Sequence, residues 1–472
     1  MRSPRSVVLF CHVATLLLAG RAVAQVPQEE IGVAAPSTQV VRAGTFGRLP
    51  ALEPDRDFHA SDPELARLLG IVLRENPDIL AARRSWLSSL ERPAQVRSLP
   101  DPRVGVRYFA ESLETRVGPQ RQSLELAQPV PWLSKLSTAG RRAERLAASL
   151  METVRQIERD RVREFKRSYY DLAYFVEALR INEQERRLLH KFEQTSLMRY
   201  STGEGIQQNV IKVQTEITRL IDQATSLAER RDILKRRLAR IMGRPEASVE
   251  IGHISLSEPV LRYDPRALEH AAVRVRPALG ALRERVRADE LLVRRRRLEF
   301  RPDFTFGLSI TDIGRRTDPA GRLAPPPDNG RDALAFLASV RIPLYARRIS
   351  SGIREAREIL SADLQRLDRE QDQVRFDVQE ATLRLDSLLE RTALYRDNLV
   401  PQAEQALSSS EAAYQTNQID FLDLIDAERI WFEVRLTYRR LLSDLWIAMS
   451  DLERAIGKRF PDQTVGLEEP SQ

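Results

Sequence analysis

Cysteine is almost absent from this chain of 472 residues. The single one, Cys11, lies in an apolar segment near the start, and the small residue that precedes a lipid-attachment cysteine is missing before it. If that segment is removed, the remaining chain has no thiol. Disulfides, thiolate metal ligands and a cysteine nucleophile are then excluded.

Long hydrophobic runs are also scarce, and the one at the start is short. Arg2 and Arg5 precede the run VVLFCHVATLLLAG, and Ala22 to Ala24 form a small-residue cleavage site. A membrane-spanning helix needs about 20 apolar residues, so residues 1–24 are predicted to be a secretory signal and not an anchor. No later window looks like a transmembrane helix, and the mean hydropathy of the chain is −0.38.

A one-sided charge balance and a reactive constellation are missing as well. The 74 basic and 67 acidic residues are interspersed, which is typical of solvated helices and unlike a nucleic-acid-binding patch. There is no phosphate-binding loop of the P-loop type. We therefore expect no enzyme, catalytic group, cofactor or nucleic-acid partner. We also expect no metal site, because metal-ligand spacing is missing among His12, His59, His190, His253 and His270.

Proline and glycine are rare in two long tracts, which are therefore predicted to be helical. Lys135 to about Arg199 has one glycine and no proline, and Arg347 to Tyr414 has one of each, Gly352 and Pro401. The first tract would be about 98 Å long at 1.5 Å per residue, which indicates a coiled coil or a helical barrel. The second tract has a heptad seam with one polar member, at Leu360, Leu364, Leu367, Gln371, Val374, Val378, Ala381, Leu385 and Leu388.

The chain repeats itself. Tyr200 to Gly243 and Tyr414 to Gly457 have the same length, and each begins with Tyr, passes a short turn and ends with Gly after a long helix. An internal duplication explains this, so residues 62–245 and 258–458 are predicted to be two helix/strand repeats, flanked by an extended arm, 25–61, and a tail, 459–472. Other helices are predicted at Ile206–Ile241, Asp420–Ile456, Pro63–Leu90 and Pro265–Leu298. On these helices alone, a soluble helical bundle is the favoured fold.

Between the shorter and the longer helices, each half changes to the alternating pattern of a strand. In the clearest case four apolar residues, Phe304 to Ile310, alternate with small or polar ones. The other strands alternate with exceptions at Phe109 and Leu337. The strands are predicted within Val104–Glu111, Ser123–Ala127, Asp303–Thr311 and Asp332–Ile342, and the loops at Leu113–Gln120 and Ile313–Arg331.

Most of these strands are near the length of a tilted membrane-crossing strand, and each has one more apolar face. Two hairpins on a soluble domain are the alternative. Four strands are too few to close a barrel, and open edges are not tolerated in lipid, so several chains would have to pool their strands. Three chains would give twelve strands, within the range of outer-membrane barrels. The lipid-facing side chains are then predicted to include Phe304, Phe306, Leu308 and Ile310.

From Asp62 to Gly457 the sequence resembles the TolC-like outer-membrane efflux family. The resemblance rests on the duplicated order of elements, on the start of the first long helix (QPVPW, from Gln128), and on YQTNQIDFLDLIDAER and LERAIG. QPVPW and PDPRVG are similar to the branch that serves heavy-metal efflux pumps.

The resemblance implies a mainly α fold with a small β part. Long antiparallel helices would form a periplasmic helical barrel, and four strands per chain would contribute to a trimeric transmembrane β-barrel. A homotrimer would sit in outer-membrane lipid with a periplasmic extension, and meet a periplasmic adaptor protein and an inner-membrane efflux pump. The implied function is the passive exit duct of a tripartite efflux system. A soluble periplasmic coiled-coil scaffold is the alternative, and the sequence does not state the cargo.

The resemblance also implies a pore constriction at Asp423 and Asp426, whose spacing places both on one helix face. Ordinary acids at a helix start, favoured by the macrodipole, are the alternative. Tyr414 and Asn209 would pack the gate. Asn209 corresponds to Asp423 in the first repeat, where some relatives carry an acid, and Ile419 replaces a basic residue of some relatives. Part of their closing network is therefore expected to be missing.

Two further features have simple explanations. Asp420 is predicted to be a helix N-cap, with Glu428 pointing away from the two constriction aspartates. The basic run Arg294–Arg297 is predicted to be a solvated helix end. Contact with lipid phosphate near a membrane surface is the alternative for this run.

Overall fold

The computed structural model describes residues 62–245, 254, 256–259, 261, 263–416 and 418–458. The chain divides into two units, Met1–Glu53 and Pro54–Gln472, and every described residue belongs to the second unit. The predicted signal segment, the arm 25–61 and the tail 459–472 lie outside the described residues.

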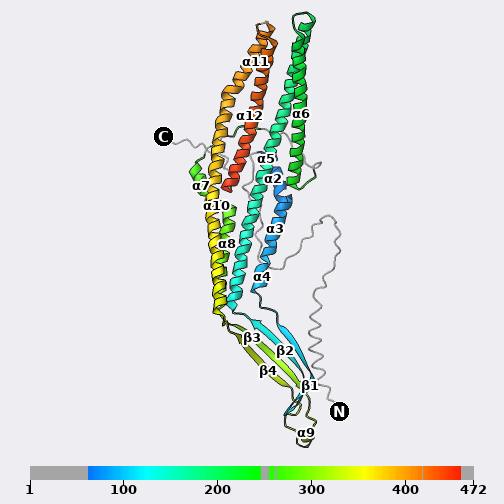
Figure 1. Cartoon of the computed structure of the whole chain (residues 1–472), viewed down its shortest axis with the longest axis vertical. Coiled ribbons are helices and arrows are strands. Elements are labelled where there is room, and N and C mark those ends of the chain that lie inside the picture. The colour runs from blue at the N-terminus through cyan, green and yellow to red at the C-terminus, as the bar shows by residue number, and fades with distance from the viewer. Residues whose placement is uncertain are drawn as a thin grey trace. The chain divides into compact units, whose positions relative to one another are not determined.

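Each half of the chain places short helices before two strands and long helices after them (Figure 1). The first half contains α2 (Pro63–Glu75), α3 (Pro77–Leu90), α4 (Arg92–Arg97), β1 (Arg103–Thr115), β2 (Gly118–Val130), α5 (Leu133–Ser201) and α6 (Gln207–Met242). The second contains α7 (Pro265–Val275), α8 (Pro277–Leu298), β3 (Asp303–Ile313), α9 (Pro319–Leu323), β4 (Ala333–Arg341), α10 (Ala346–Leu394), the π-helical turn η3 (Tyr395–Leu399), α11 (Val400–Gln415) and α12 (Phe421–Ile456). The mainly α fold with a small β part is confirmed.

The two proline-poor tracts form long helices, as the sequence predicts. α5 continues for 69 residues, and α10 continues for 49 before η3 leads into α11. In η3 the N–H of Val400 donates to the carbonyl of Tyr395, five residues back instead of four. Pro401 explains this irregularity, because its nitrogen carries no hydrogen and cannot continue the regular ladder.

Two segments predicted as single helices, Pro63–Leu90 and Pro265–Leu298, are each split in two. The residue before the internal proline, Asn76 or Arg276, has an extended backbone with ψ of 125° or 124°. Proline Cδ disfavours the helical conformation of the residue before it, so the first helix ends there. Each proline then begins the next helix, at a position that needs no N–H.

These breaks create equivalent joints in the two halves. Asn76 Nδ2 donates to the carbonyl oxygen of Ile241 at 2.7 Å. In the second half, Arg276 Nη1 donates to the carbonyl oxygen of Ala455 at 3.3 Å. Each acceptor lies in the last turn of a long helix, α6 or α12, where carbonyls have no partner within the helix. The two halves therefore have joints of the same form, and their origin by duplication stays a prediction.

α6 and α12 both end at the glycines that the sequence repeat predicts. Gly243 has φ of 69° and Gly457 has φ of 77°, the left-handed conformation that usually requires glycine. The glycines also lie against the joints. A Cβ on Gly243 would come within 2.7 Å of the carbonyl oxygen of Glu75, and one on Gly457 within 2.9 Å of Cα of Arg276.

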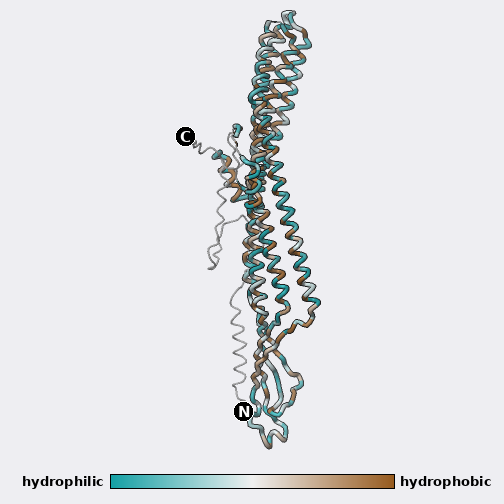
Figure 2. The backbone as a smooth tube through the Cα atoms, turned by 90° about the vertical axis from the view of Figure 1, so that its left-hand side faces the viewer, coloured by the Kyte–Doolittle hydropathy of each residue, from teal (hydrophilic) through white to brown (hydrophobic). Residues whose placement is uncertain are grey.

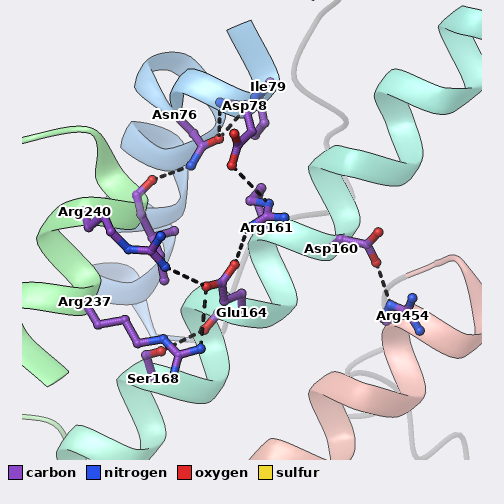
Figure 3. A network of polar contacts seen from close by, with 11 residues as sticks. Asn76, Asp78, Ile79, Asp160, Arg161, Glu164, Ser168, Arg237, Arg240 and Arg454 are labelled. Atoms are coloured by element: carbon purple, nitrogen blue, oxygen red, sulfur yellow. Dashed lines mark hydrogen bonds and ion pairs between the residues drawn. The ribbon is translucent and has the colours of Figure 1, made fainter. Parts of the chain in front are cut away.

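A polar network beside the first joint ties α6 to α5 (Figure 3). Glu164 on α5 forms ion pairs with Arg237 and Arg240 near the end of α6, at 3.6 and 3.3 Å. Arg454, near the end of α12, pairs with Asp160 of α5 at 2.6 Å. α5 therefore holds the C-terminal ends of both α6 and α12.

The heptad seam of α10 is confirmed in its second half only. Its members from Val374 to Leu388 are buried, whereas the side chain of Leu364 is exposed. In the first half of the seam, from Leu360 to Gln371, the buried residue is Asp363, which is not a member of the seam. Arg285 Nε donates to its carboxylate at 2.6 Å, and Arg366 forms a second ion pair with it. A charge that is paired in this way can take a buried position that the apolar spacing would assign to leucine.

The four strands form one antiparallel sheet in the order β1-β2-β3-β4, so the β2–β3 pairing joins the two halves of the chain. The first hairpin is tighter than predicted. Most of Leu113–Gln120, expected to be a loop, belongs to the strands. A register shift between Tyr108 and Leu113 interrupts the alternation, which hid the strand's true length. The other predicted loop, Ile313–Arg331, contains the short helix α9.

The helices pack through three buried apolar clusters. One joins α2, α3, α5 and α6 to α12, and a second joins α7, α8, α10 and α12. The third lies between α5, α6, α11 and α12 near their turns. Hydrophobic and hydrophilic residues interleave along the helices (Figure 2). Among the described residues, no helix combines the length and the apolarity that crossing a membrane requires.

Candidate functional site

Two turns that connect helices form the end of the molecule opposite to the sheet (Figure 1). The first, Thr202–Ile206, joins α5 to α6, and Gly203 in it has φ of 76°. The second, Thr416–Asp420, joins α11 to α12. We call this end the helix tip. All four residues proposed for the constriction and the gate lie on the helices that meet there.

Tyr414 connects the two turns. Its side chain is 7% exposed, and the guanidinium of Arg199 on α5 lies 4.3 Å from the centre of its ring. Arg199 also donates to the carbonyl oxygen of Tyr414 at 3.0 Å. This pair binds the last turn of α5 to the last turn of α11. The role of Tyr414 in packing a gate stays a prediction.

An apolar core lies behind Tyr414. The ring of Phe421, the first residue of α12, meets the ring of Tyr414 edge to face at a centroid distance of 5.5 Å. Ile419 is half-buried against the same cluster. Ile419 therefore contributes apolar packing at this turn. The buried members are Ile181, Leu189, Val213, Ile217, Leu220, Leu407, Tyr414, Phe421, Leu424, Ile425 and Phe432.

Asp423 and Asp426 lie on the exposed face of α12, as their spacing predicts. Asp426 forms an ion pair with Arg429, one turn further on. Asp423 shows no hydrogen bond or ion pair within the described part of the chain. Asp420 takes the N-cap position with an extended backbone, but its side chain makes no cap hydrogen bond. A single chain therefore offers one paired and one unpaired aspartate to its surroundings.

Asn209 lies in the first turn of α6 and is half-buried. Its backbone N–H donates to the carbonyl oxygen of Ile206 at 3.2 Å. Within the described residues, no hydrogen bond joins its side chain to Tyr414 or to Asp423. Its role in packing the gate stays a prediction.

Glu428 is a residue of the tip whose burial the sequence analysis missed. It is 3% exposed, and its Oε1 has no hydrogen-bond partner in the described structure. Burial raises the pKa of this carboxyl to about 8, although Arg429 acts in the opposite direction. Helical spacing could have revealed it, because Phe421, Leu424, Ile425 and Phe432 share its face of α12.

At the other end of the molecule, the sheet has one apolar face. Directly opposed residues of an antiparallel sheet share a face, so the register defines rows across it. Two rows are Val104–Leu126–Leu308–Phe336 and Val106–Leu124–Ile310–Leu334, and Phe304 and Phe306 extend the same face. Phe306 is 53% exposed and Phe336 is 84% exposed.

The opposite face is polar or small. Its rows include Gly105–Glu125–Ser309–Ala335 and Arg107–Ser123–Thr311–Ala333. Leu337, the exception in the alternation, lies on this face opposite Gly307. In the described structure β1 and β4 have no second strand neighbour, so the sheet has two open edges.

Metal-ligating groups do not gather in the described residues. No cluster of three or more His, Cys, Asp and Glu side chains there has the geometry to hold an ion. His190 pairs with Glu193 on an exposed helix face. His12, His59 and His253 lie outside the described residues.

Solved outer-membrane channels share this arrangement. The chain superposes on the channel OprN with a TM-score of 0.70 and 16% sequence identity, over 84% of this chain and 90% of that one. The TM-score is 0.69 for VceC of Vibrio cholerae, at 19% identity over 84% and 97% of the two chains. It is also 0.69 for CusC, at 15% identity over 84% and 93%. The chain has the fold of the TolC-like outer-membrane channels.

Sequence similarity to a curated protein is confined to a short stretch of the chain and is weaker evidence than the shared fold. A stretch of 63 residues is 27% identical to the cobalt-zinc-cadmium resistance protein CzcC of Cupriavidus metallidurans. The match spans 13% of this chain and 15% of that protein, a small part of either. No protein-family model matches the chain.

Proposed function

We propose that the chain is a passive exit duct of the outer membrane and that it works as a homotrimer. The observation that carries this proposal is an open sheet with one apolar face, attached to helices much longer than those of an ordinary globular bundle. In lipid, the unpaired N–H and C=O groups of β1 and β4 would have no water to bind. Pairing β4 of one chain with β1 of the next removes both edges, and three chains close a barrel of twelve strands.

The helix tip is the proposed constriction. In a trimer, three copies of α12 would bring six carboxylates, Asp423 and Asp426 from each chain, around one axis. Like charges in a narrow site focus the electric field and attract cations. Arg199 and Tyr414 would hold the two turns of each chain together, and Asn209 would leave the first repeat without an equivalent charge.

The proposed partners are a periplasmic adaptor protein and an inner-membrane pump that supplies the energy, as in a tripartite efflux system. The long helices would form the periplasmic extension of the duct. The similarity of one stretch to a cobalt-zinc-cadmium resistance protein supports divalent metal cations as the cargo class. Such cations would suit an acidic constriction.

Cell fractionation tests the location. The full chain, expressed with its own N-terminal segment in a Gram-negative host, is expected in the outer-membrane fraction and to need detergent for release. Recovery in the soluble periplasmic fraction would instead support a coiled-coil scaffold. Loss of metal resistance on deletion, restored by the wild-type gene, would then test the cargo class.

A further inference from the structure

The four connections that join the strands to α4, α5, α8 and α10 lie at the same end of the sheet (Figure 1). β1 and β3 begin there, and β2 and β4 end there, because neighbouring strands are antiparallel. The connecting residues are 98–102, 131–132, 299–302 and 342–345. The chain therefore crosses this boundary four times.

Exposed arginines gather at this boundary. The C-terminal turns of α8 contribute three, the start of α10 two, and the connections and strand ends three. We call this set the arginine collar, and its members are Arg103, Arg294, Arg295, Arg297, Arg301, Arg341, Arg347 and Arg348. The basic run of the sequence is thus one part of a larger group brought together by the fold.

Few acids neutralise the collar. In the described residues 97–103, 130–133, 294–303 and 341–348, the acids are Asp101, Glu299 and Asp303. Asp303 already accepts hydrogen bonds from Lys135 Nζ at 2.8 Å and from the N–H of Trp132 at 3.0 Å. The three α8 arginines of the collar have no ion pair within the described structure. The boundary therefore carries an excess of positive charge.

The opposite end of the sheet differs. There, Arg116 pairs with Asp328 at 3.1 Å, and Arg316 pairs with Asp318 at 2.6 Å. Two arginines of this end are thus paired with loop acids, whereas no collar arginine forms an ion pair within the described residues.

Large apolar side chains are exposed among the collar arginines. Leu344 and Tyr345, in the connection after β4, are 79% and 77% exposed. The set comprises Leu99, Leu133, Phe300, Ile342, Leu344 and Tyr345. A mixture of apolar and long cationic side chains suits the interface between hydrocarbon and headgroups, where the stem lies in the apolar layer and the charge reaches outward.

We propose that the arginine collar binds the phosphate groups of anionic phospholipids in the leaflet nearest the helices. This inference rests on the proposed outer-membrane location. A planar guanidinium can donate two parallel hydrogen bonds to a phosphodiester, which adds direction to the attraction of charge. The collar would fix the depth of the barrel in the bilayer.

Lipid retention measured by native mass spectrometry tests the proposal. The full protein is purified in a neutral detergent with equal amounts of phosphatidylglycerol and phosphatidylcholine. The wild type is expected to retain at least about three times as much phosphatidylglycerol as phosphatidylcholine, because each arginine near an anionic surface adds to the attraction. In roughly 0.5 M NaCl the Debye length shrinks to a few Å, so the attraction between the arginines and the lipid phosphates is screened. The preference for the anionic lipid is then expected to fall toward parity.

A pair of variants separates the collar from net charge. The collar variant is R294Q/R295Q/R297Q/R347Q/R348Q, and the control carries the same charge change on exposed helix arginines that show no ion pair, R230Q/R357Q/R369Q/R384Q/R391Q. The preference is expected to vanish in the collar variant and to persist in the control. Equal retention of both lipids by the wild type, or equal loss in both variants, would overturn the proposal.

Two further outcomes keep the test decisive. If the collar variant does not assemble, the smaller variant R347Q/R348Q must lower the preference while it elutes like the wild type. If wild-type protein fractionates with outer membranes but shows no anionic preference, the collar proposal fails and the duct stands. If it does not fractionate there, the proposed function itself fails.

Discussion

Glu428 places a carboxyl group in the interior of the helix tip. Its pKa of about 8 means that the folded protein holds it protonated at neutral pH. Because this pKa is raised above the ordinary value near 4.5, the stability it contributes is complete below about pH 4.5 and is lost as the pH rises through about 8. The tip is thus predicted to loosen under alkaline conditions.

Glu428→Gln keeps the shape of the neutral acid and removes the titration. We expect the variant to have a higher apparent Tm than the wild type at pH 9 and little difference at pH 4, where both the folded and the unfolded wild type are protonated. Differential scanning calorimetry at the two pH values measures this. Glu433→Gln, at an exposed position of the same helix, is the control and should not alter the pH dependence. A parallel fall in Tm with pH for wild type and Glu428→Gln would contradict the assignment.

The exposed aspartates of the tip give a second prediction at this scale. Asp423→Ala/Asp426→Ala should weaken cation selectivity and block by multivalent cations, because the carboxylates would no longer ring the pore. Stability should change little, since exposed helix acids contribute roughly 0.3–1 kcal/mol. Single-channel recording in planar bilayers measures selectivity and block.

Asp368→Ala/Asp372→Ala is a matched control for that experiment. It also removes one exposed aspartate and one that pairs with an arginine three residues on, here Arg375 at 2.8 Å. Unchanged selectivity in the tip variant, or the same change in the control, would leave Asp423 and Asp426 as ordinary acids of a helix start.

At the scale of single elements, the two faces of β3 differ by one residue step. Ile310→Asp would place a charge among Leu124 and Leu334, whereas Thr311→Asp lies between Ser123 and Ala333. If the apolar face meets lipid, the first change should cost stability, by less than the about 2–4 kcal/mol of a basic residue at the midplane. The second should be tolerated. Thr311 is a better control than Ser309, which lies opposite the carboxylate of Glu125.

Heat-modified mobility and protease resistance of outer-membrane fractions measure this assembly. Ile310→Asp is expected to reduce the assembled form, and Thr311→Asp to leave it near the wild-type level. Equal loss in both variants would mean that the sheet does not separate lipid from lumen as proposed.

Sequence patterns recovered the elements unevenly, for physical reasons. β3 has strict alternation, and its predicted start at Asp303 is correct. β1 contains a register shift after Tyr108, so its alternation stops before the strand does. The breaks at Asn76 and Arg276 could have been predicted from the prolines that follow. The burial of Asp363 could not, because it depends on Arg285 from another helix.

At the tip, spacing alone predicted that Asp423 and Asp426 share one helix face, and in the structure both are exposed. The contact between Arg199 and Tyr414 joins residues far apart in the chain and has no local signal. Whether the aspartates face a pore depends on copies of the chain, so a single sequence and a single chain leave that role as a proposal.

For the whole molecule, the open edges of the sheet predict a trimer. Native mass spectrometry in detergent should give about three times the mass of the mature chain, with no stable monomer. Introducing proline into β4, for example Ala335→Pro, removes a backbone donor and should reduce assembly more than the same change in the loop at Ala324. A stable monomer or dimer of the wild type would contradict the closed barrel.

The β2–β3 pairing within one chain has the same antiparallel form as the pairing proposed between chains. Six separate half-chains could thus close the same barrel, and the fusion of two halves in one gene reduces the parts to three. If the halves arose by the predicted duplication, fusion would also free them to diverge, and the corresponding residues Asn209 and Asp423 differ in charge. A duct of identical halves would repeat every tip charge six times, whereas the proposed trimer of this chain would set each charge at three alternate places. Gene duplication thereby becomes a means of adjusting the charge of an opening in steps of three.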